Sequence, residues 1–256
     1  MTLVILATLP GLGVLTWLYG IGNLVNLLLA SATALLVEAL VLKIRQRPLV
    51  FFLNDRSALL SAVLLALALP PYAPWWLTVI ASASALLLGK HLYGGLGQNP
   101  FNPAMLGYVV VLISFPVEMT SWPAPHTVGL LEGLQQILGI ANLPDGWAQA
   151  TALDALKVNK SLTIDELYAS NLAFGRFGGA GSEAVNLAFL AGGLYLLHKR
   201  LFTWHAPVGM LAALFVMSLL FWNGSGSDSN GSPLFHLLTG ATMLGAFFIV
   251  TDPVSG

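Results

Sequence analysis

The sequence predicts an all-α integral membrane protein, a polytopic helix bundle of about eight segments with one folded loop on its outer side. Hydrophobic residues make up 57% of the 256 residues, and charged residues only 8%. Soluble domains carry roughly 25% charged residues, so this chain has too few to cover a water-facing surface. Apolar runs recur along the chain, several of them near the length of about 20 residues that a spanning helix needs.

Eight apolar stretches are the expected membrane segments. The third and fifth are short, because at about 1.5 Å per residue each covers only roughly 20 Å of a hydrocarbon core that is about 30 Å thick. We expect these two to extend into their flanks or to be broken helices that line a site. Kinks are expected at Pro10 and at the glycines beside the last stretch. The stretches are 2–19, 22–42, 57–69, 74–89, 103–117, 184–198, 206–222 and 234–250.

Basic residues predict the orientation of these segments. If the first segment runs from inside to outside, seven of the ten Lys and Arg residues fall on the cytoplasmic side, as the positive-inside rule expects. The remaining three share one long outer stretch, where the rule is weak. The inner residues are Lys43, Arg45, Arg47, Arg56, Lys90, Lys199 and Arg200, and the outer ones are Lys157, Lys160 and Arg176.

This topology divides the chain into three parts. Residues 1–116 form N-terminal membrane helices, residues 117–182 an extracytoplasmic loop, and residues 183–256 C-terminal membrane helices. A weak echo between 57–70 and 240–253, which would run in opposite directions, predicts inverted repeats with a binding site between the halves.

The loop is expected to fold as a small cap. An amphipathic helical stripe runs from Leu130 to Leu138. Thr163-Ile-Asp-Glu166 has the pattern of a capping box. The stretch "GRFGGAGSE" (175–183) is typical of a flexible return to the membrane.

Composition excludes several classes of function. There is no Cys, so the chain has no thiolates for iron–sulfur clusters and no disulfides. A net charge of −1 and the lack of a basic stripe argue against nucleic-acid binding. The five histidines lack metal-ligand spacing, so no metal site is expected. Most of them lie near the proposed membrane boundaries, where side chains with a polar tip are common.

Acidic residues in or beside apolar runs are candidates for an ion pathway, because charges in a membrane are costly and often functional. They are Glu38, Asp55 and Asp252. The alternative is an interfacial pair of Glu38 with Lys43 and of Asp55 with Arg56, and an Asp252 that faces cytoplasmic water.

The stretch "YGGLGQNPFNPAM" (93–105) fails as a dinucleotide fingerprint, because no strand precedes it. It predicts an irregular turn buried in protein. Asn99, Asn102 and Gly97 are candidates for flavin or ion contacts, and a purely structural turn is the alternative.

A polar stretch near the middle of the chain, "NLPDGWAQATALDALK" (142–157), raises a sharper question. Thr151-Ala-Leu-Asp154 has the pattern of a helix N-terminus with Thr151 as the N-cap. A helix N-terminus also favours a phosphate group. Trp147 lies four residues earlier, where it either stacks on a bound ring or anchors the loop to the bilayer surface.

Four stretches together resemble one known family. They are similar to the D subunit of the Rnf-type ion-translocating electron transport complex. The stretches are "KHLYGGLGQNPFNPAMLGYVVVLISFPVEMTSW" (90–122), "LLTGATMLGAFFIVTDPV" (237–254), "PPYAPWW" (70–76) and "DGWAQATALD" (145–154). A sister subunit occurs in the sodium-pumping NADH:quinone reductase. The family pattern extends beyond both ends of this sequence, so we expect the chain to be a fragment.

The resemblance implies covalent FMN, bound through a phosphoester to a threonine of an extracytoplasmic loop and installed by a flavin transferase. Thr151 matches this threonine, with Asp145 and Ala150 as parts of the attachment motif, while Ala148 stands where Ser or Thr is usual. The similar "TGAT" at 239–242 is rejected, because His236 replaces the Asp and Thr242 lies within a predicted membrane helix.

The resemblance further implies a redox-driven pump of Na⁺ or H⁺ in the bacterial inner membrane, with the Thr151 loop on the periplasmic side. The expected partners are a flavin-carrying G-type subunit, membrane A- and E-type subunits, and iron–sulfur B- and C-type subunits that handle NADH and ferredoxin. A second, noncovalent flavin such as riboflavin is a further expectation. The rival interpretations are a passive solute channel or transporter and a scaffold without flavin.

Overall fold

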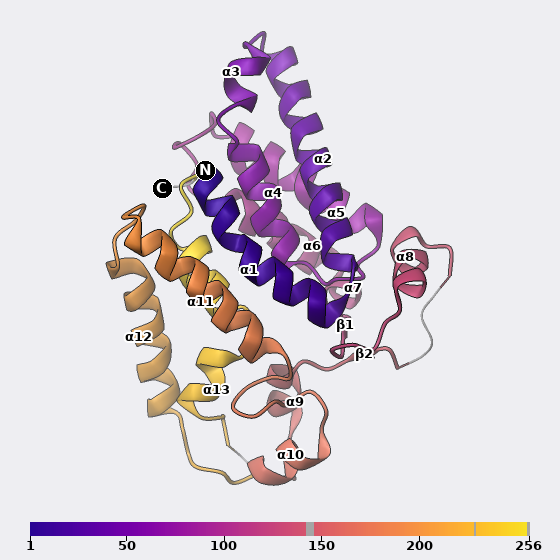
Figure 1. Cartoon of the computed structure of the whole chain (residues 1–256), viewed down its shortest axis with the longest axis vertical. Coiled ribbons are helices and arrows are strands. Elements are labelled where there is room, and N and C mark those ends of the chain that lie inside the picture. Colours follow the sequence, from indigo (N-terminus) through magenta and orange to yellow (C-terminus); the bar gives the residue numbers. More distant parts are fainter. Residues whose placement is uncertain (142–145, 228, 255–256) are drawn as a thin grey trace.

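The computed structural model describes residues 1–141, 146–227 and 229–254, and the chain in these ranges is mostly helical (Figure 1). The long helices run up and down the longest axis of the molecule. The N-terminus lies in the half that carries α3 (Leu49–Leu53), whereas α9 (Ala152–Val158) and α10 (Ile164–Ser170) lie at the opposite end (Figure 1). This arrangement separates the two ends of the bundle, as the predicted topology requires.

Helices occupy the first seven predicted stretches. Two of them, α1 and α2, are long and apolar enough to cross a membrane, judged by length and composition alone. Pro10 lies inside α1, which continues through it. The fourth stretch passes from an α-helix into a π-helix, η1. The helices are α1 (Thr2–Tyr19), α2 (Gly22–Ile44), α4 (Ser57–Ala68), α5 (Trp75–Ser84), η1 (Ala85–His91), α6 (Pro103–Ser114), α11 (Ser182–His198) and α12 (His205–Leu220), with the short α7 (Pro116–Thr120) after α6.

The eighth stretch is broken, so the prediction of one helix over 234–250 is wrong. It consists of α13 (Pro233–Leu238), α14 (Thr242–Leu244) and the π-helix η2 (Gly245–Ile249). Gly240 has a φ of 66° and turns the chain between α13 and α14. Asn186 of α11 spans this break, because its amide donates to Leu238 O and Gly240 O and its Oδ1 accepts from Met243 N.

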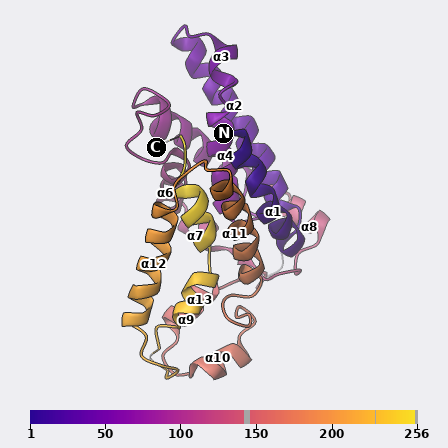
Figure 2. The same ribbon diagram turned by 60° about the vertical axis from the view of Figure 1, so that its left-hand side comes forward.

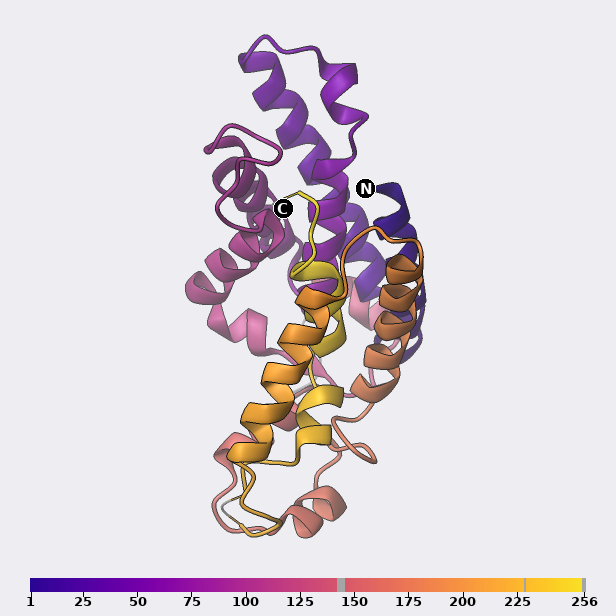
Figure 3. The same cartoon turned by 90° about the vertical axis from the view of Figure 1, so that its left-hand side faces the viewer.

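The main apolar core joins α1 to α11 and α2 to α4, the helix pairs with the most extensive contacts among the described residues. Small residues permit the first of these contacts. Gly11 of α1 lies against the ring of Phe189, and Gly192 of α11 lies against the backbone of Ala7. A side chain at either glycine would overlap its neighbour, so the glycines set the distance between α1 and α11. Figure 2 and Figure 3 show α1 and α11 side by side, and Figure 2 shows α12 at the edge of the bundle.

The loop folds as a small cap. The predicted amphipathic helix is α8 (Leu130–Leu138), and the predicted capping box begins α10, where Thr163 is the N-cap. Two short strands, β1 (Trp122–Pro123) and β2 (Ala148–Gln149), pair antiparallel. A second hydrophobic cluster, separate from the main core, holds α9 and α10 against α13. Its buried members are Ala152, Leu156, Leu167, Phe174 and Phe235.

The glycine-rich stretch 175–183 is tied down by hydrogen bonds. The backbone amides of Phe177 and Gly178 donate to Glu183 Oε1 at 2.6 and 2.8 Å. Gly179 N donates to Thr239 Oγ1 at 3.2 Å, which links this stretch to the break between α13 and α14. The return of the chain to the bundle is therefore an ordered turn with defined partners.

Candidate functional site

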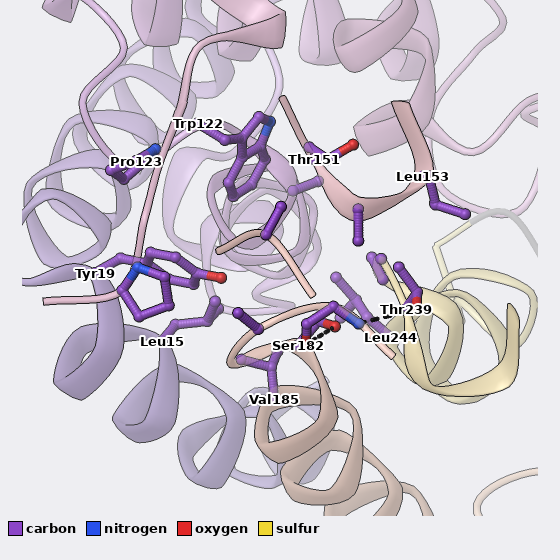
Figure 4. Close-up of a pocket in the computed structure, with 18 of the residues that line it drawn as sticks. Leu15, Tyr19, Trp122, Pro123, Thr151, Leu153, Ser182, Val185, Thr239 and Leu244 are labelled. Atoms are coloured by element: carbon purple, nitrogen blue, oxygen red, sulfur yellow. Dashed lines mark hydrogen bonds between the residues drawn. The ribbon is translucent and has the colours of Figure 1, made fainter. Parts of the chain in front are cut away.

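A cavity of about 440 Å³ lies where the loop meets the helix bundle (Figure 4). Its walls come from α1, α4, α6 and α11 of the bundle, from the break before α14, and from β1, β2 and α9 of the loop. The walls are mostly apolar, with the aromatic side chains of Tyr19, Tyr108 and Trp122 among them. The polar side chains on the wall are those of Gln149, Thr151, Ser182 and Thr239, besides the hydroxyls of the two tyrosines and the indole of Trp122.

Thr151 lies on the rim of this cavity. The pairing of Trp122 with Gln149 holds the preceding residues in an extended strand that ends at the rim. Thr151 is the N-cap of α9, as predicted, and its Oγ accepts from the backbone N–H of Asp154 at 3.3 Å. The hydroxyl also donates to Asp154 Oδ2 at 2.7 Å. The threonine is therefore a helix cap and at the same time a cavity-lining residue.

The other residues of the predicted attachment motif take different positions. Ala150 lines the cavity beside Thr151. Asp145 lies outside the described residues. Trp147 contacts the edge of Tyr72, with ring centroids 6.3 Å apart, and is not part of the cavity wall. Trp122 of β1, and not Trp147, is the tryptophan on the wall.

Thr242, the rejected alternative, lies near the cavity but not on its wall. It is the first residue of α14, and the expectation that it lies inside a continuous helix is wrong. Its hydroxyl lies 3.0 Å from His236 O and 3.0 Å from Thr239 O, to which it donates. Backbone carbonyls thus engage the Thr242 hydroxyl, whereas the Thr151 hydroxyl faces a carboxylate at an open rim.

A second polar site is buried between α2, α4 and η1. Glu38 of α2 is 2% exposed, and its two carboxylate oxygens meet Lys90 Nζ at 2.8 Å and His91 Nε2 at 2.9 Å. Lys90 Nζ also donates to Ser57 Oγ at 2.7 Å, and Ser57 Oγ donates to Asp55 Oδ1 at 2.6 Å. These contacts form one continuous polar chain from Asp55 to His91 across α2, α4 and η1.

Comparison with known proteins gives the family. The model of the NQR2, RnfD, RnfE family matches residues 1–256, which is the whole chain. The chain belongs to this family.

Relatives within the family are close. A protein of Ectopseudomonas mendocina (strain ymp) is 83% identical over 253 residues, covering 99% of this chain and 74% of the relative. One of Pseudomonas aeruginosa (strain LESB58) is 69% identical over 257 residues, covering 100% and 75%. One of Cellvibrio japonicus (strain Ueda107) is 55% identical over 264 residues, covering 100% and 74%. Each is named as the D subunit of an ion-translocating oxidoreductase complex.

In this member of the NQR2, RnfD, RnfE family, the acidic residues do not have the partners that sequence proximity suggested. Glu38 pairs with Lys90 and His91, not with Lys43, so the expected pair with Lys43 is wrong. The expected pair of Asp55 with Arg56 is also wrong. Asp55 Oδ1 accepts from the backbone and hydroxyl of Ser57, while Arg56 donates to Thr2 Oγ1 at 2.6 Å.

Asp252 is buried rather than exposed to water. Its residue exposure is 3%, and Oδ1 accepts from Val254 N at 3.1 Å. The expectation that Asp252 faces cytoplasmic water is therefore wrong. His91 is buried too.

Asn99 and Asn102 serve the turn before α6. Asn102 Oδ1 caps α6 by accepting from Met105 N at 3.2 Å, and its amide donates to Ile249 O at 3.2 Å. The Asn99 amide, turned with its nitrogen toward Lys90 O and Gly95 O, donates to them at 3.0 and 2.9 Å. Gly97 N donates to Val254 O. None of the three residues lines the cavity beside Thr151.

Two features of these candidate sites were not predicted from the sequence. The roles of Lys90 and His91 were missed, although a Lys-His pair at the end of an apolar run could have been matched to the buried Glu38. The cavity walls from α1 and α11 were missed because no local pattern marks them. Only the tertiary contact between these helices brings Tyr19 and Ser182 to one space.

Proposed function

We propose that this chain carries FMN on Thr151 and passes electrons within an ion-translocating oxidoreductase complex. That the chain is a subunit of such a complex follows from its family and from relatives of up to 83% identity. The observation that carries the flavin proposal is the position of Thr151 on the rim of a cavity of about 440 Å³. A group joined to the Thr151 oxygen has a space beside it in which to lie.

The cavity has the character of a cofactor site. Ligand pockets range over roughly 300–1,000 Å³ and are mostly apolar, with a few polar groups that fix orientation. Here Tyr19 and Trp122 lie edge to face with centroids 6.3 Å apart, and together with Tyr108 they offer flat apolar surface. Figure 4 shows Thr151 and Trp122 on one side of the space and Ser182 and Val185 on the other.

The residues of the wall would hold the group and keep water from it, while bound FMN supplies the one- and two-electron redox chemistry. Thr151 anchors the phosphate on the rim, where the loop is open to solvent. The apolar walls from α1, α6 and α11 favour a flat ring and disfavour a charged one. This division of roles would place the phosphate outside and the ring inside.

We further propose that the helices form a multi-pass membrane domain with inverted repeats, in the bacterial inner membrane and with Thr151 on the periplasmic side. The alternating helix directions and the separation of α3 from α10 along the long axis support this arrangement (Figure 1). The eighth segment is long enough to cross the membrane only if α13, α14 and η2 together form one spanning segment despite the break between α13 and α14.

Partner subunits complete the electron path in this proposal. The chain contains no Cys, so iron–sulfur clusters would be held by B-, C-, A- or E-type subunits, and a second covalent flavin by a G-type subunit. A flavin transferase would load Thr151. The proposal also keeps a second, noncovalent flavin such as riboflavin as an expectation.

Glu38, Asp55 and Asp252 remain the proposed ion-pathway residues. The polar chain from Asp55 through Ser57 and Lys90 to Glu38 supports a path between the inner surface and the bundle interior. Lys90 satisfies the Glu38 carboxylate, so a cation would bind there only after the ammonium moves away. Coupling requires that this exchange differ between redox states.

In-gel flavin fluorescence of the denatured protein tests the main proposal. The chain is co-expressed with a flavin transferase as wild type, Thr151→Ala and Thr242→Ala. Fluorescence that is lost in Thr151→Ala and kept in Thr242→Ala is the expected result. Thr242→Ala is the matched control, because Thr242, like Thr151, follows an alanine and lies close by.

A dark wild type, in the presence of a transferase that labels a control substrate, would overturn the flavin proposal. The rival function is then a passive solute channel or a scaffold within the complex. The broken eighth segment favours the channel over the scaffold, because broken helices line transport sites in other membrane proteins.

A further inference from the structure

The hydroxyl of Thr151 makes both of its hydrogen bonds to a single residue, Asp154. It donates to Asp154 Oδ2 at 2.7 Å and accepts from the Asp154 backbone N–H at 3.3 Å. A hydroxyl has one proton and two acceptor lone pairs. The proton is thus directed at a carboxylate, one lone pair is engaged, and the other lone pair is available to a reacting atom.

We propose that Asp154 is the base that accepts the Thr151 proton when flavin is attached. This inference rests on the proposed function, because it concerns the loading of the same threonine. Thr151 Oγ attacks the riboflavin-side phosphorus of a flavin adenine dinucleotide held by the transferase. The Oγ–P bond forms, and the bond from that phosphorus to the bridging oxygen breaks. AMP leaves with the electron pair of that bond, the hydroxyl proton passes to Asp154 Oδ2, and no atom changes its oxidation state.

Both residues are accessible to a second protein. Asp154 is exposed and Thr151 is partly buried on the rim of the cavity. Thr151 is the N-cap of α9 and Asp154 lies in its first turn, at the end of the molecule away from α3 (Figure 1). A transferase that approaches this end would find the nucleophile and its base together, so the acceptor chain itself contributes to the reaction.

The Asp154 carboxylate accelerates the reaction as a base and slows it by charge repulsion, and the larger of the two effects determines the net rate. A positioned general base accelerates proton transfer by about 10²–10⁴-fold. Repulsion between the Asp154 carboxylate and the anionic pyrophosphate, about 4 Å apart in water, slows approach by a factor of roughly five. The balance favours acceleration by at least an order of magnitude.

Thr163 makes a similar threonine–carboxylate contact away from the cavity. Thr163 Oγ donates to Glu166 Oε2 at 2.8 Å and accepts from Glu166 N at 3.4 Å, which is nearly the same arrangement. Thr163 is not part of the cavity wall. It is therefore an internal comparison, in which the cap geometry is present and the cavity is not.

The test measures the rate of flavin attachment to the full chain in detergent. Purified transferase and flavin adenine dinucleotide are added, and the fluorescence and mass of the denatured chain are followed with time. We expect Asp154→Asn to be labelled about 100-fold more slowly than the wild type, because an amide accepts a hydrogen bond but not the proton. Asp154→Glu should recover a part of the rate. Asp165→Asn, which changes an exposed acid in the first turn of α10, should match the wild type.

The outcomes separate this inference from the proposed function. A labelled wild type with Asp154→Asn within threefold of its rate would overturn the role of Asp154 and leave flavin on Thr151 intact. Equal slowing in Asp154→Asn and Asp165→Asn would also overturn it, because the effect would then follow charge and not position. A wild type without label would remove both proposals together.

Discussion

Lys90 and His91 follow each other in the chain, and both contact the carboxylate of Glu38. Neighbouring residues on a regular α-helix point about 100° apart, so they seldom share one small target. Here they end the π-helix η1, a type of irregular turn that occurs often at functional sites. The wider turn brings an ammonium and an imidazole to the two oxygens of one buried acid.

Removal of Lys90 should destabilise the chain, because the buried Glu38 carboxylate loses its ammonium partner. Lys90→Met leaves Glu38 without its ammonium, and breaking a buried pair in this way costs about 3–5 kcal/mol. We expect a fall of roughly 10 °C in the thermal midpoint of the purified chain. The double variant Glu38→Gln with Lys90→Met removes both charges and should recover most of that loss. A double variant as unstable as Lys90→Met would mean that packing, and not charge, is what Lys90 contributes.

The hydrogen bonds to Glu166 predict that the stability of α10 depends on pH. The Thr163 backbone N–H and then its hydroxyl donate to Glu166, and these bonds lower the pKa of the carboxyl below its ordinary value of 4.5. Because the pKa of this carboxyl is lower in the folded chain than in the unfolded one, its ionised form stabilises α10 at pH values above the unfolded pKa. This stabilisation is lost as the pH falls through the folded pKa. Hydrogen-exchange protection of α10 should therefore fall between about pH 5 and pH 3, and Glu166→Gln should abolish the pH dependence. The same dependence in Glu166→Gln would contradict this account.

At the scale of elements, α1 and α11 pack closely because glycines lie between them. A methyl group added at Gly11 would overlap the ring of Phe189, whereas one added at Gly13, two residues along the same helix, would meet nothing within 4 Å. Overpacking of this kind costs about 1–3 kcal/mol. Alanine in place of an exposed helical glycine stabilises by about 0.5–1 kcal/mol.

Gly11→Ala and Gly13→Ala should therefore change stability in opposite directions. We expect the fraction of folded chain that survives heating in detergent, followed by size-exclusion chromatography, to fall for Gly11→Ala and to stay level or rise for Gly13→Ala. Both changes raise the helix propensity of α1 equally, so propensity cancels in the comparison. A loss of stability in both variants would show that α1 is sensitive to any added side chain and that the contact with Phe189 is not special.

The positions of most helices could be predicted from the sequence, because a long apolar run has few other stable conformations in a membrane. α1 was expected over 2–19 and is found at Thr2–Tyr19. The break at 239–241 could not be predicted, because Thr, Gly and Ala also fit within an apolar helix. It depends on Asn186, which lies more than 50 residues earlier and binds the exposed backbone groups of the break. A contact at that distance leaves no local pattern.

At the scale of the whole molecule, the candidate site was only partly predictable. Thr151 was identified from a short motif, and its role as an N-cap from the Thr-x-x-Asp pattern. The cavity beside it was not, because its walls come from elements between α1 and η2 that meet only in the folded chain. The partner of Glu38 was missed for the same reason, since Lys90 is 52 residues away and Lys43 is five. Local spacing identifies a candidate residue, and tertiary packing determines what surrounds it.

The lack of cysteine makes the orientation of the whole molecule testable with single-cysteine variants. Ser161 lies in the loop between α9 and α10, and Asn54 lies between α3 and α4 at the opposite end (Figure 1). Both residues are exposed, so each substitution should be tolerated. If the proposed topology holds, a membrane-impermeant maleimide will label Ser161→Cys in intact cells and Asn54→Cys only after permeabilisation.

The unsubstituted chain is the control for this labelling, because it offers no thiol before or after permeabilisation. Labelling of Asn54→Cys in intact cells, with Ser161→Cys protected, would reverse the orientation and put Thr151 on the cytoplasmic side. Labelling of both sites in intact cells would mean that the bundle does not separate two compartments. Either orientation separates Thr151 from Glu38, but only the first pattern, with Ser161 outside and Asn54 inside, puts the proposed flavin on the periplasmic side and the polar chain at Glu38 toward the cytoplasm.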